Sequence, residues 1–235
     1  MARLDIGRAY TFGFEDGDWI VKLLLGGLIL LFGLVFSIVL VGLVAFLILS
    51  GYVVAIARNV AQGRDVPLPR WENMGEMLVD GLRVTVATVV WSLPVLFLLL
   101  PLFVLTLLVP ADSDVWGAVL AILFICLGLP AILYGVFVAL ISPVLMWQIA
   151  AERRVAAALN VGRVWQIFTA HLGKVILIAI VLWVTNLLAT LVGLLICGVG
   201  ILLTSVWYLW VEGHLVGQLG RLVQEDGGAE VVAPV

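Results

Sequence analysis

Three long apolar blocks dominate the chain, and short charged segments separate them. The blocks at residues 19–61 and 174–211 are each too long for one crossing, because about 20 apolar residues span ~30 Å of hydrocarbon. We therefore expect two helical hairpins, which turn near residues 33–37 and 197–200, with the first two spans at 19–35 and 36–60. The middle block predicts spans at 83–108 and 116–147, separated by the polar loop VPADSDV. The pattern predicts an all-α polytopic membrane bundle of about six transmembrane helices.

The composition places this bundle in lipid. Hydrophobic residues make up 64% of the chain and charged residues only 11%, whereas soluble domains have roughly half apolar and about a quarter charged residues. The net charge of −3 provides no basic face for nucleic acid, so we expect no nucleic-acid partner. The length leaves no room for a sizeable soluble domain. We expect one transmembrane domain over residues 1–223 and a flexible cytoplasmic tail over residues 224–235.

The basic residues predict the orientation of the bundle. With six spans, every lysine and arginine falls on one side of the membrane, and only Asp112 and Asp114 fall on the other. Loops rich in lysine and arginine stay in the cytoplasm. Both termini are therefore predicted to be cytoplasmic.

Three short segments beside the hairpins, at residues 2–14, 71–82 and 153–172, have amphipathic patterns. Each fits a helix in the membrane interface or one packed on the cytoplasmic ends of the spans. The first and third are similar, because Asp5-Ile-Gly-Arg corresponds to Asn160-Val-Gly-Arg. We predict that a unit of interfacial helix plus hairpin occurs at 5–62 and again at 160–224, with a weaker middle copy at 80–152.

Charged side chains within the spans are candidates for a site, because they are costly in lipid and often functional. Arg58 and Glu212 lie closest to the membrane interior, each near the predicted cytoplasmic end of its helix. Spans two and six are equivalent in the predicted repeat, so the two side chains could meet across the bundle. We expect Arg58 to be paired, with Glu212 as the preferred partner, or to reach the interface. His214 lies beside Glu212, but two scattered histidines do not supply a zinc site. The sequence predicts neither a metal nor a cofactor.

Polar and small residues give further candidates. Asn186 lies in the middle of the fifth span, where an asparagine usually bonds to a neighbouring helix and less often contacts a ligand. Gly213 and Gly217 form a GxxxG pattern, which predicts close approach of another helix to the sixth span.

Several motifs resemble one family. They are D-I-G-R-A-Y-T-F and E-D-x-D-W at 5–19, G-Y and R-N-V at 51–63, L-P-x-W-E and V-D-G-L at 68–82, and G-H-L-x-G-Q at 213–218. Over essentially the whole chain, the sequence resembles an uncharacterised prokaryotic family of multi-pass membrane proteins, catalogued as a domain of unknown function. It is distantly similar in plan to the membrane domain of some glycerophosphodiester phosphodiesterases. The resemblance implies a membrane bundle in a bacterial or archaeal inner (plasma) membrane and brings no catalytic residues.

Three functions remain open. The first is a non-enzymatic accessory or scaffold subunit that contacts membrane lipids and a membrane-protein partner or further copies of itself. The second is a transporter or channel for a lipid or apolar solute, which the repeat and the prolines 94, 101, 130 and 143 favour. The third is an enzyme that acts on lipid head groups through Arg58, Glu212 and His214. We expect the first, because the spans lack central carboxylates and histidines and the extramembrane parts are small.

Overall fold

The computed structural model describes residues 4–108, 114–196 and 198–230, and it confirms the predicted all-α fold. It is 87% helical, and the described ranges contain no strand. The elements are α1 (Ile6–Thr11), a 3-10 turn η1 (Phe12–Glu15), α2 (Trp19–Val35), α3 (Val41–Ala61), α4 (Met74–Leu108), α5 (Asp114–Glu152), α6 (Val155–Leu159), α7 (Val161–Ala170), α8 (Leu172–Leu195) and α9 (Gly200–Glu230).

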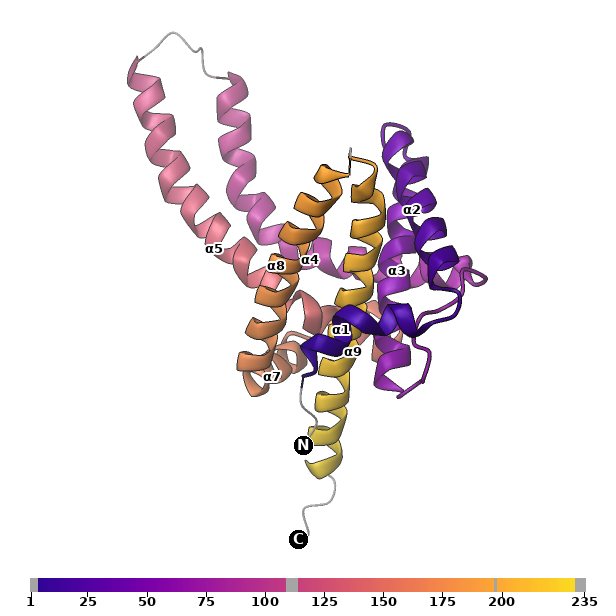
Figure 1. Ribbon diagram of the computed structural model, residues 1–235. Coiled ribbons are helices and arrows are strands. Elements are labelled where there is room, and N and C mark those ends of the chain that lie inside the picture. Colours follow the sequence, from indigo (N-terminus) through magenta and orange to yellow (C-terminus); the bar gives the residue numbers. More distant parts are fainter. Residues whose placement is uncertain (1–3, 109–113, 197, 231–235) are drawn as a thin grey trace.

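Helices α3 and α9 pack side by side at the centre of the bundle, with α2 and α8 beside them (Figure 1). The turns between α2 and α3 and between α8 and α9 lie at one end of the molecule, whereas α1 and α7 lie toward the other (Figure 1). The predicted hairpins are therefore present, and the first span has the predicted bounds, since α2 covers Trp19–Val35. The first turn lies slightly later than predicted, because α3 begins at Val41.

The described helices give four or five candidate membrane crossings, compared with the six predicted. Among the described residues, α3, α4, α5 and α8 are long and apolar enough to cross a membrane. The segment Ile6–Glu15 and α2, joined by a bend of 100°, make a fifth candidate. Helix α2 alone has 17 residues and rises ~25 Å, slightly less than the hydrocarbon thickness. Helix α9 is not among the candidates, and much of its surface contacts other helices, mainly α3 and α8.

Glycines allow α3 and α4 to cross with their backbones in contact. A Cβ atom built at Gly51 would overlap the carbonyl oxygen of Met77, and one built at Gly81 would overlap that of Leu47. The segment 71–82 therefore does not form a separate interfacial helix. Residues from Met74 onward are the first turns of α4, because the two glycines let this part of the helix pack tightly on α3.

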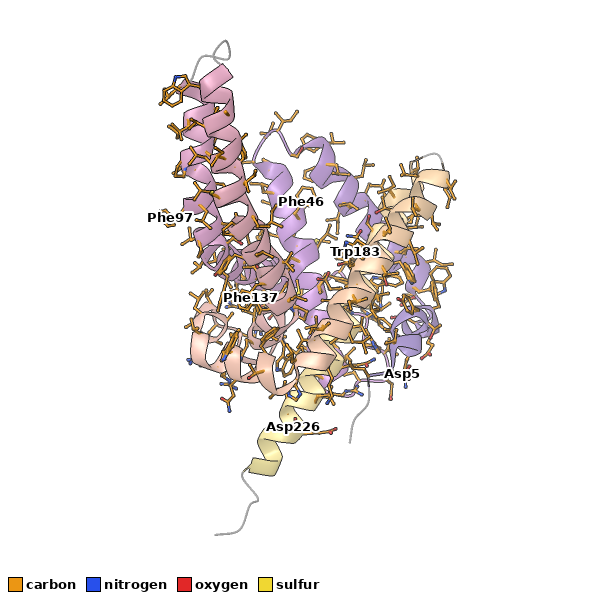
Figure 2. The ribbon with its side chains drawn as sticks, turned by 90° about the vertical axis from the view of Figure 1, so that its left-hand side faces the viewer. Asp5, Phe46, Phe97, Phe137, Trp183 and Asp226 are labelled. Carbon is orange, nitrogen blue, oxygen red and sulfur yellow. The ribbon has the colours of Figure 1, made fainter. Side chains whose placement is uncertain are left out.

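The outer parts of α4 and α5 form a hairpin that stands apart from α8 and α9 (Figure 1). Its surface is apolar: Phe97, which points away from the bundle in Figure 2, is 72% exposed, and Leu107 is 70% exposed. Pro94 and Pro101 lie inside α4, yet the helix is continuous. Exposed apolar side chains in this number fit a multi-pass membrane protein whose hairpin faces lipid.

The two predicted copies share local features. Asp5 accepts a hydrogen bond from the Arg8 amide at 2.9 Å, and Asn160 accepts one from the Arg163 amide at 3.1 Å. Each capped helix leads to a hairpin of two long helices, but the duplication itself stays a prediction. The tail predicted over 224–235 is helical as far as Glu230, since α9 continues beyond the buried Leu222; residues 231–235 lie outside the described ranges.

Candidate functional site

Arg58 forms an ion pair, as predicted, but its partner is Asp80 and not the expected Glu212. Its Nη2 atom lies 2.8 Å from Oδ2 of Asp80, and its Nε donates to the carbonyl of Ala150 at 3.1 Å. Asp80 is only 2% exposed and also accepts from Arg83. The crossing of α3 and α4 places Asp80 beside Arg58. Glu212 instead lies on the side of α9 that faces α5 and α8. The i,i+3 spacing of Asp80 and Arg83 was a sequence signal for part of this cluster.

A third guanidinium reaches the cluster from the turn after α5. Nη2 of Arg153 lies 3.4 Å from Oε2 of Glu76 and 3.7 Å from Oδ2 of Asp80. Arg153 has a φ of 54°, a left-handed conformation that costs a residue with a side chain about 1–2 kcal/mol. This turn directs the chain from α5 into α6. The strained residue is therefore the one whose side chain interacts with both Glu76 and Asp80.

A second site brings together two of the predicted residues. Glu212 of α9 and Asn186 of α8 both line a pocket of about 480 Å³ between α5, α8 and α9, which we call the lateral pocket. Ser142 and Tyr208 add two hydroxyl groups, and the other lining side chains are apolar. The exposed Trp183 lies at its outer wall. The sequence marked Glu212 and Asn186 separately and could not place them together.

The position of Glu212 differs from the prediction. Because α9 runs on to Glu230, Glu212 lies well inside the helix and not near its end. It is six residues before Gln218 and therefore ~9 Å deeper along the axis. Among the described residues, its carboxylate makes no hydrogen bond or ion pair. A carboxylate in apolar surroundings without a partner is costly and marks a functional candidate.

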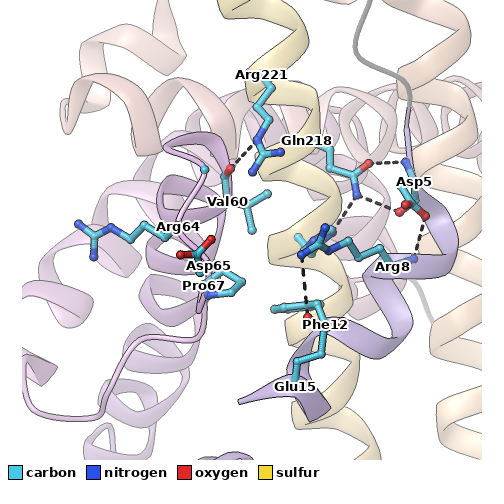
Figure 3. A pocket seen from close by; sticks show the side chains of 12 residues that line it. Asp5, Arg8, Phe12, Glu15, Val60, Arg64, Asp65, Pro67, Gln218 and Arg221 are labelled. Atoms are coloured by element: carbon cyan, nitrogen blue, oxygen red, sulfur yellow. Dashed lines mark hydrogen bonds and ion pairs between the residues drawn. The ribbon is translucent and has the colours of Figure 1, made fainter. Parts of the chain in front are cut away.

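His214 belongs to a separate polar pocket of about 320 Å³, where α1 meets α9 and the end of α3 (Figure 3). Its Nδ1 lies 2.9 Å from Nε2 of Gln218, and its ring packs on Phe12 with the centroids 4.4 Å apart. Gln218 also exchanges two backbone hydrogen bonds with Asp5, at 2.7 and 2.9 Å. His214 therefore helps to fix α1 on α9 and does not face Glu212.

Gly213 and Gly217 provide the predicted close approach, but within the chain. A Cβ at Gly213 would lie 2.7 Å from Cβ of Ile56, and one at Gly217 would lie 2.6 Å from the carbonyl oxygen of Ala57. Both contacts are with α3. Helix α3 therefore already occupies the face of α9 that these glycines form.

Among the described residues, no three histidine, cysteine, aspartate or glutamate side chains are grouped so that they could hold a metal ion. Three polar sites contain the candidate polar residues: the arginine cluster around Asp80, the lateral pocket with Glu212, and the Gln218 network.

Comparison with known proteins gives one match. A family model described as a protein of unknown function (DUF4013) matches residues 34–198, which is most of the chain. No curated protein and no solved structure matches the chain. The expected similarity to the membrane domain of glycerophosphodiester phosphodiesterases is not among the matches.

Proposed function

The chain belongs to this family of unknown function, and from its geometry we propose that it is a non-enzymatic accessory or scaffold subunit of the membrane. In this proposal it binds a transmembrane helix of a partner protein, or of a second copy, in the lateral pocket. The observation that carries the proposal is the unpaired Glu212 carboxylate, which lines a mainly apolar pocket together with the exposed side chains of Ile180 and Trp183.

The chemistry of the pocket indicates what kind of helix would fit. Lipid chains cover apolar walls well, but they offer nothing to a carboxylate. A helix with a basic or hydrogen-bond-donating side chain would supply the missing partner of Glu212, and Asn186 could bond to the same group. Interhelical hydrogen bonds of this kind contribute about 0.6–2 kcal/mol in membranes. Trp183 and Ile180, which are both exposed on α8, would pack against the apolar part of that helix.

The proposal includes a topology. We propose six crossings, counting α2 and α9, with both termini in the cytoplasm of a prokaryotic plasma membrane. The one-sided placement of the basic residues supports this topology. The basic residues in the described ranges lie away from the two hairpin turns, in elements that include α1, α7 and the segment 62–73. Ser113 and Asp112 lie outside the described residues, so labelling of introduced cysteines is needed to show which side of the membrane this loop is on. A cysteine at Ser113 should be labelled from outside intact cells, and one at Gly75 should not.

The partner helix can be tested by purification in mild detergent and measurement of the mass of the native complex. We expect a second chain at fixed stoichiometry. Glu212→Leu and Trp183→Ala should release it while leaving the thermal unfolding of the protein unchanged. Leu28→Ala is the matched control, since Leu28 is 60% exposed on α2 and lies outside the pocket.

Two outcomes would overturn the proposal. If the second chain stays bound in Glu212→Leu and Trp183→Ala, the lateral pocket is not its docking place. If the protein is monomeric and moves a fluorescent lipid across liposome bilayers in a Glu212-dependent way, the same pocket serves a transporter for lipids or apolar solutes. That function is the second candidate, because the pocket combines exposed apolar side chains with polar groups.

A further inference from the structure

We propose that the arginine cluster is a binding site for a phosphate group, carried by an anionic lipid head group. The site is a pocket of about 480 Å³ between the end of α3, the segment 62–73, the start of α4 and the turn after α5. We call it the arginine pocket. Four guanidinium groups line it, those of Arg58, Arg64, Arg70 and Arg153.

The charges in this pocket are not balanced within the chain. Asp80 is buried and is shared by Arg58, Arg83 and Arg153, so one carboxylate faces three cations. Glu76 offsets part of this charge through Arg153, and Glu72 pairs with Arg70 where both are mostly exposed. The guanidinium groups therefore outnumber the carboxylates around the pocket, and a bound anion would meet excess positive charge.

Arg64 is the residue that the fold leaves free for a ligand. Its side chain makes no hydrogen bond or ion pair with any described residue. Its position follows from the local backbone, because the Arg64 amide donates to the carbonyl of Asn59 at 3.1 Å and so closes the end of α3. Guanidinium groups present paired N–H donors that match the oxygens of a phosphate.

The surroundings favour a lipid as the carrier of that phosphate. Val66 lines the pocket and is exposed, and Met74, which follows the lining residue Asn73 in sequence, is an exposed apolar residue at the start of α4. The buried Met77 forms part of the apolar wall. A head group among the arginines could therefore leave its chains along apolar side chains. Basic pockets between the cytoplasmic ends of membrane helices are suited to anionic head groups.

The strained turn supports the same assignment. Arg153 keeps a left-handed backbone at the point from which its side chain reaches Glu76 and Asp80. Strained backbone of this kind persists where the surrounding structure fixes it, and such positions occur often at ligand sites.

The test uses the whole protein in nanodiscs of phosphatidylcholine with and without phosphatidylglycerol, followed by native mass spectrometry of the lipids that stay bound. We expect the protein to retain phosphatidylglycerol selectively. Arg64→Gln should lower that retention several-fold without changing thermal unfolding, because Arg64 supports no internal contact. Arg154→Gln is the control: Arg154 is exposed on the same end of the molecule, pairs with Glu152, and lies outside the pocket.

A second arm separates lipid from free phosphate. If inorganic phosphate raises the thermal stability of the unmodified protein in neutral detergent, and does so less for Arg64→Gln, the pocket binds the phosphate group from solution as well. Equal retention of phosphatidylglycerol by Arg64→Gln and Arg154→Gln, together with no effect of inorganic phosphate, would overturn the proposal.

Discussion

The two halves of α4 lie in different surroundings. The inner half, from Met74 to about residue 91, packs on α3 through Gly51 and Gly81 and carries the buried Asp80. The outer half contacts mainly α5, and side chains such as Phe97 are exposed. The inner half carries all three charged residues of α4, Glu76, Asp80 and Arg83, whereas the outer half has none.

This difference teaches what holds helices together in an apolar solvent. Lipid chains solvate leucine and phenylalanine as well as a neighbouring helix does, so helices associate where backbones can approach closely or where polar groups need partners. The inner half has both features. The outer half has neither toward α8, and α4 and α5 therefore diverge from the core there. Contacts within the chain therefore hold the inner half of α4 in place, whereas the packing of the outer hairpin depends on its surroundings.

The largest effect should come from filling the crossing of α3 and α4. Gly51→Leu places a side chain where the carbonyl of Met77 lies, and the helices must separate. Overpacking costs about 1–3 kcal/mol when side chains can move, and backbone moves less readily, so we expect more than ~3 kcal/mol. Thermal unfolding in detergent measures the loss.

Gly128→Leu is the matched control on the outer hairpin, because a Cβ at Gly128 has nothing within 4 Å. The same change in helix propensity, about 1 kcal/mol, applies at both positions. Equal unfolding temperatures for the two variants would contradict the packing described for the inner half of α4.

The second effect concerns the charges of the inner half. Asp80→Asn leaves three guanidinium groups without their shared carboxylate, and breaking a buried pair typically costs about 3–5 kcal/mol. Arg58→Gln should cost less, because Asp80 keeps Arg83 and Arg153. Denaturation of both single variants and the double variant should give a coupling energy of about 0.5–3 kcal/mol.

The cycle of Arg58→Gln with Glu212→Gln sharpens this result. These residues belong to different sites, so their effects should add within about 0.5 kcal/mol. A coupling energy between Arg58 and Glu212 as large as that between Arg58 and Asp80 would support the ion pair predicted from the sequence and contradict the separation of the two sites.

The smallest effect is expected on the outer hairpin. Phe97→Ala removes a ring that is 72% exposed, so the free energy of unfolding should change by no more than about 0.5 kcal/mol. Leu102→Ala is the comparison on the same helix half: Leu102 is 1% exposed, and its truncation should cost about 2–5 kcal/mol. If Phe97→Ala destabilises the purified protein as much as Leu102→Ala does, the hairpin has a second contact surface within the protein.

The sequence predicted the all-α fold and most of the long helices, but not the contacts between them. The bounds of α2 follow from a sharp change in polarity after Asp18. The GxxxG pattern correctly indicated close approach at Gly213 and Gly217, yet it could not identify α3 as the neighbour. Periodicity defines the faces of one helix, whereas the choice of neighbour depends on crossing angles that arise from the whole bundle.

The polar sites show the same limit. The predicted pair of Arg58 and Glu212 was based on equivalent positions in two repeats, but the side chains point to different neighbours in the fold. Asp80 was visible as part of V-D-G-L, and its spacing to Arg83 indicated one contact. The approach of Arg153 from the turn after α5 depends on a left-handed residue that no pattern in the sequence marks.

The central place of α9 has a consequence for the order of events during synthesis. Its glycines pack against Ile56 and Ala57 of α3, but α9 begins about 140 residues after α3 ends. At ~5–20 residues per second, the ribosome needs roughly 7–28 s to reach it. During that time α3 and its hairpin are already made while the helix that will occupy their centre does not exist. A nascent chain interrupted before Gly200 would expose the face of α3 to any other helix nearby, including the insertion and quality-control machinery of the membrane.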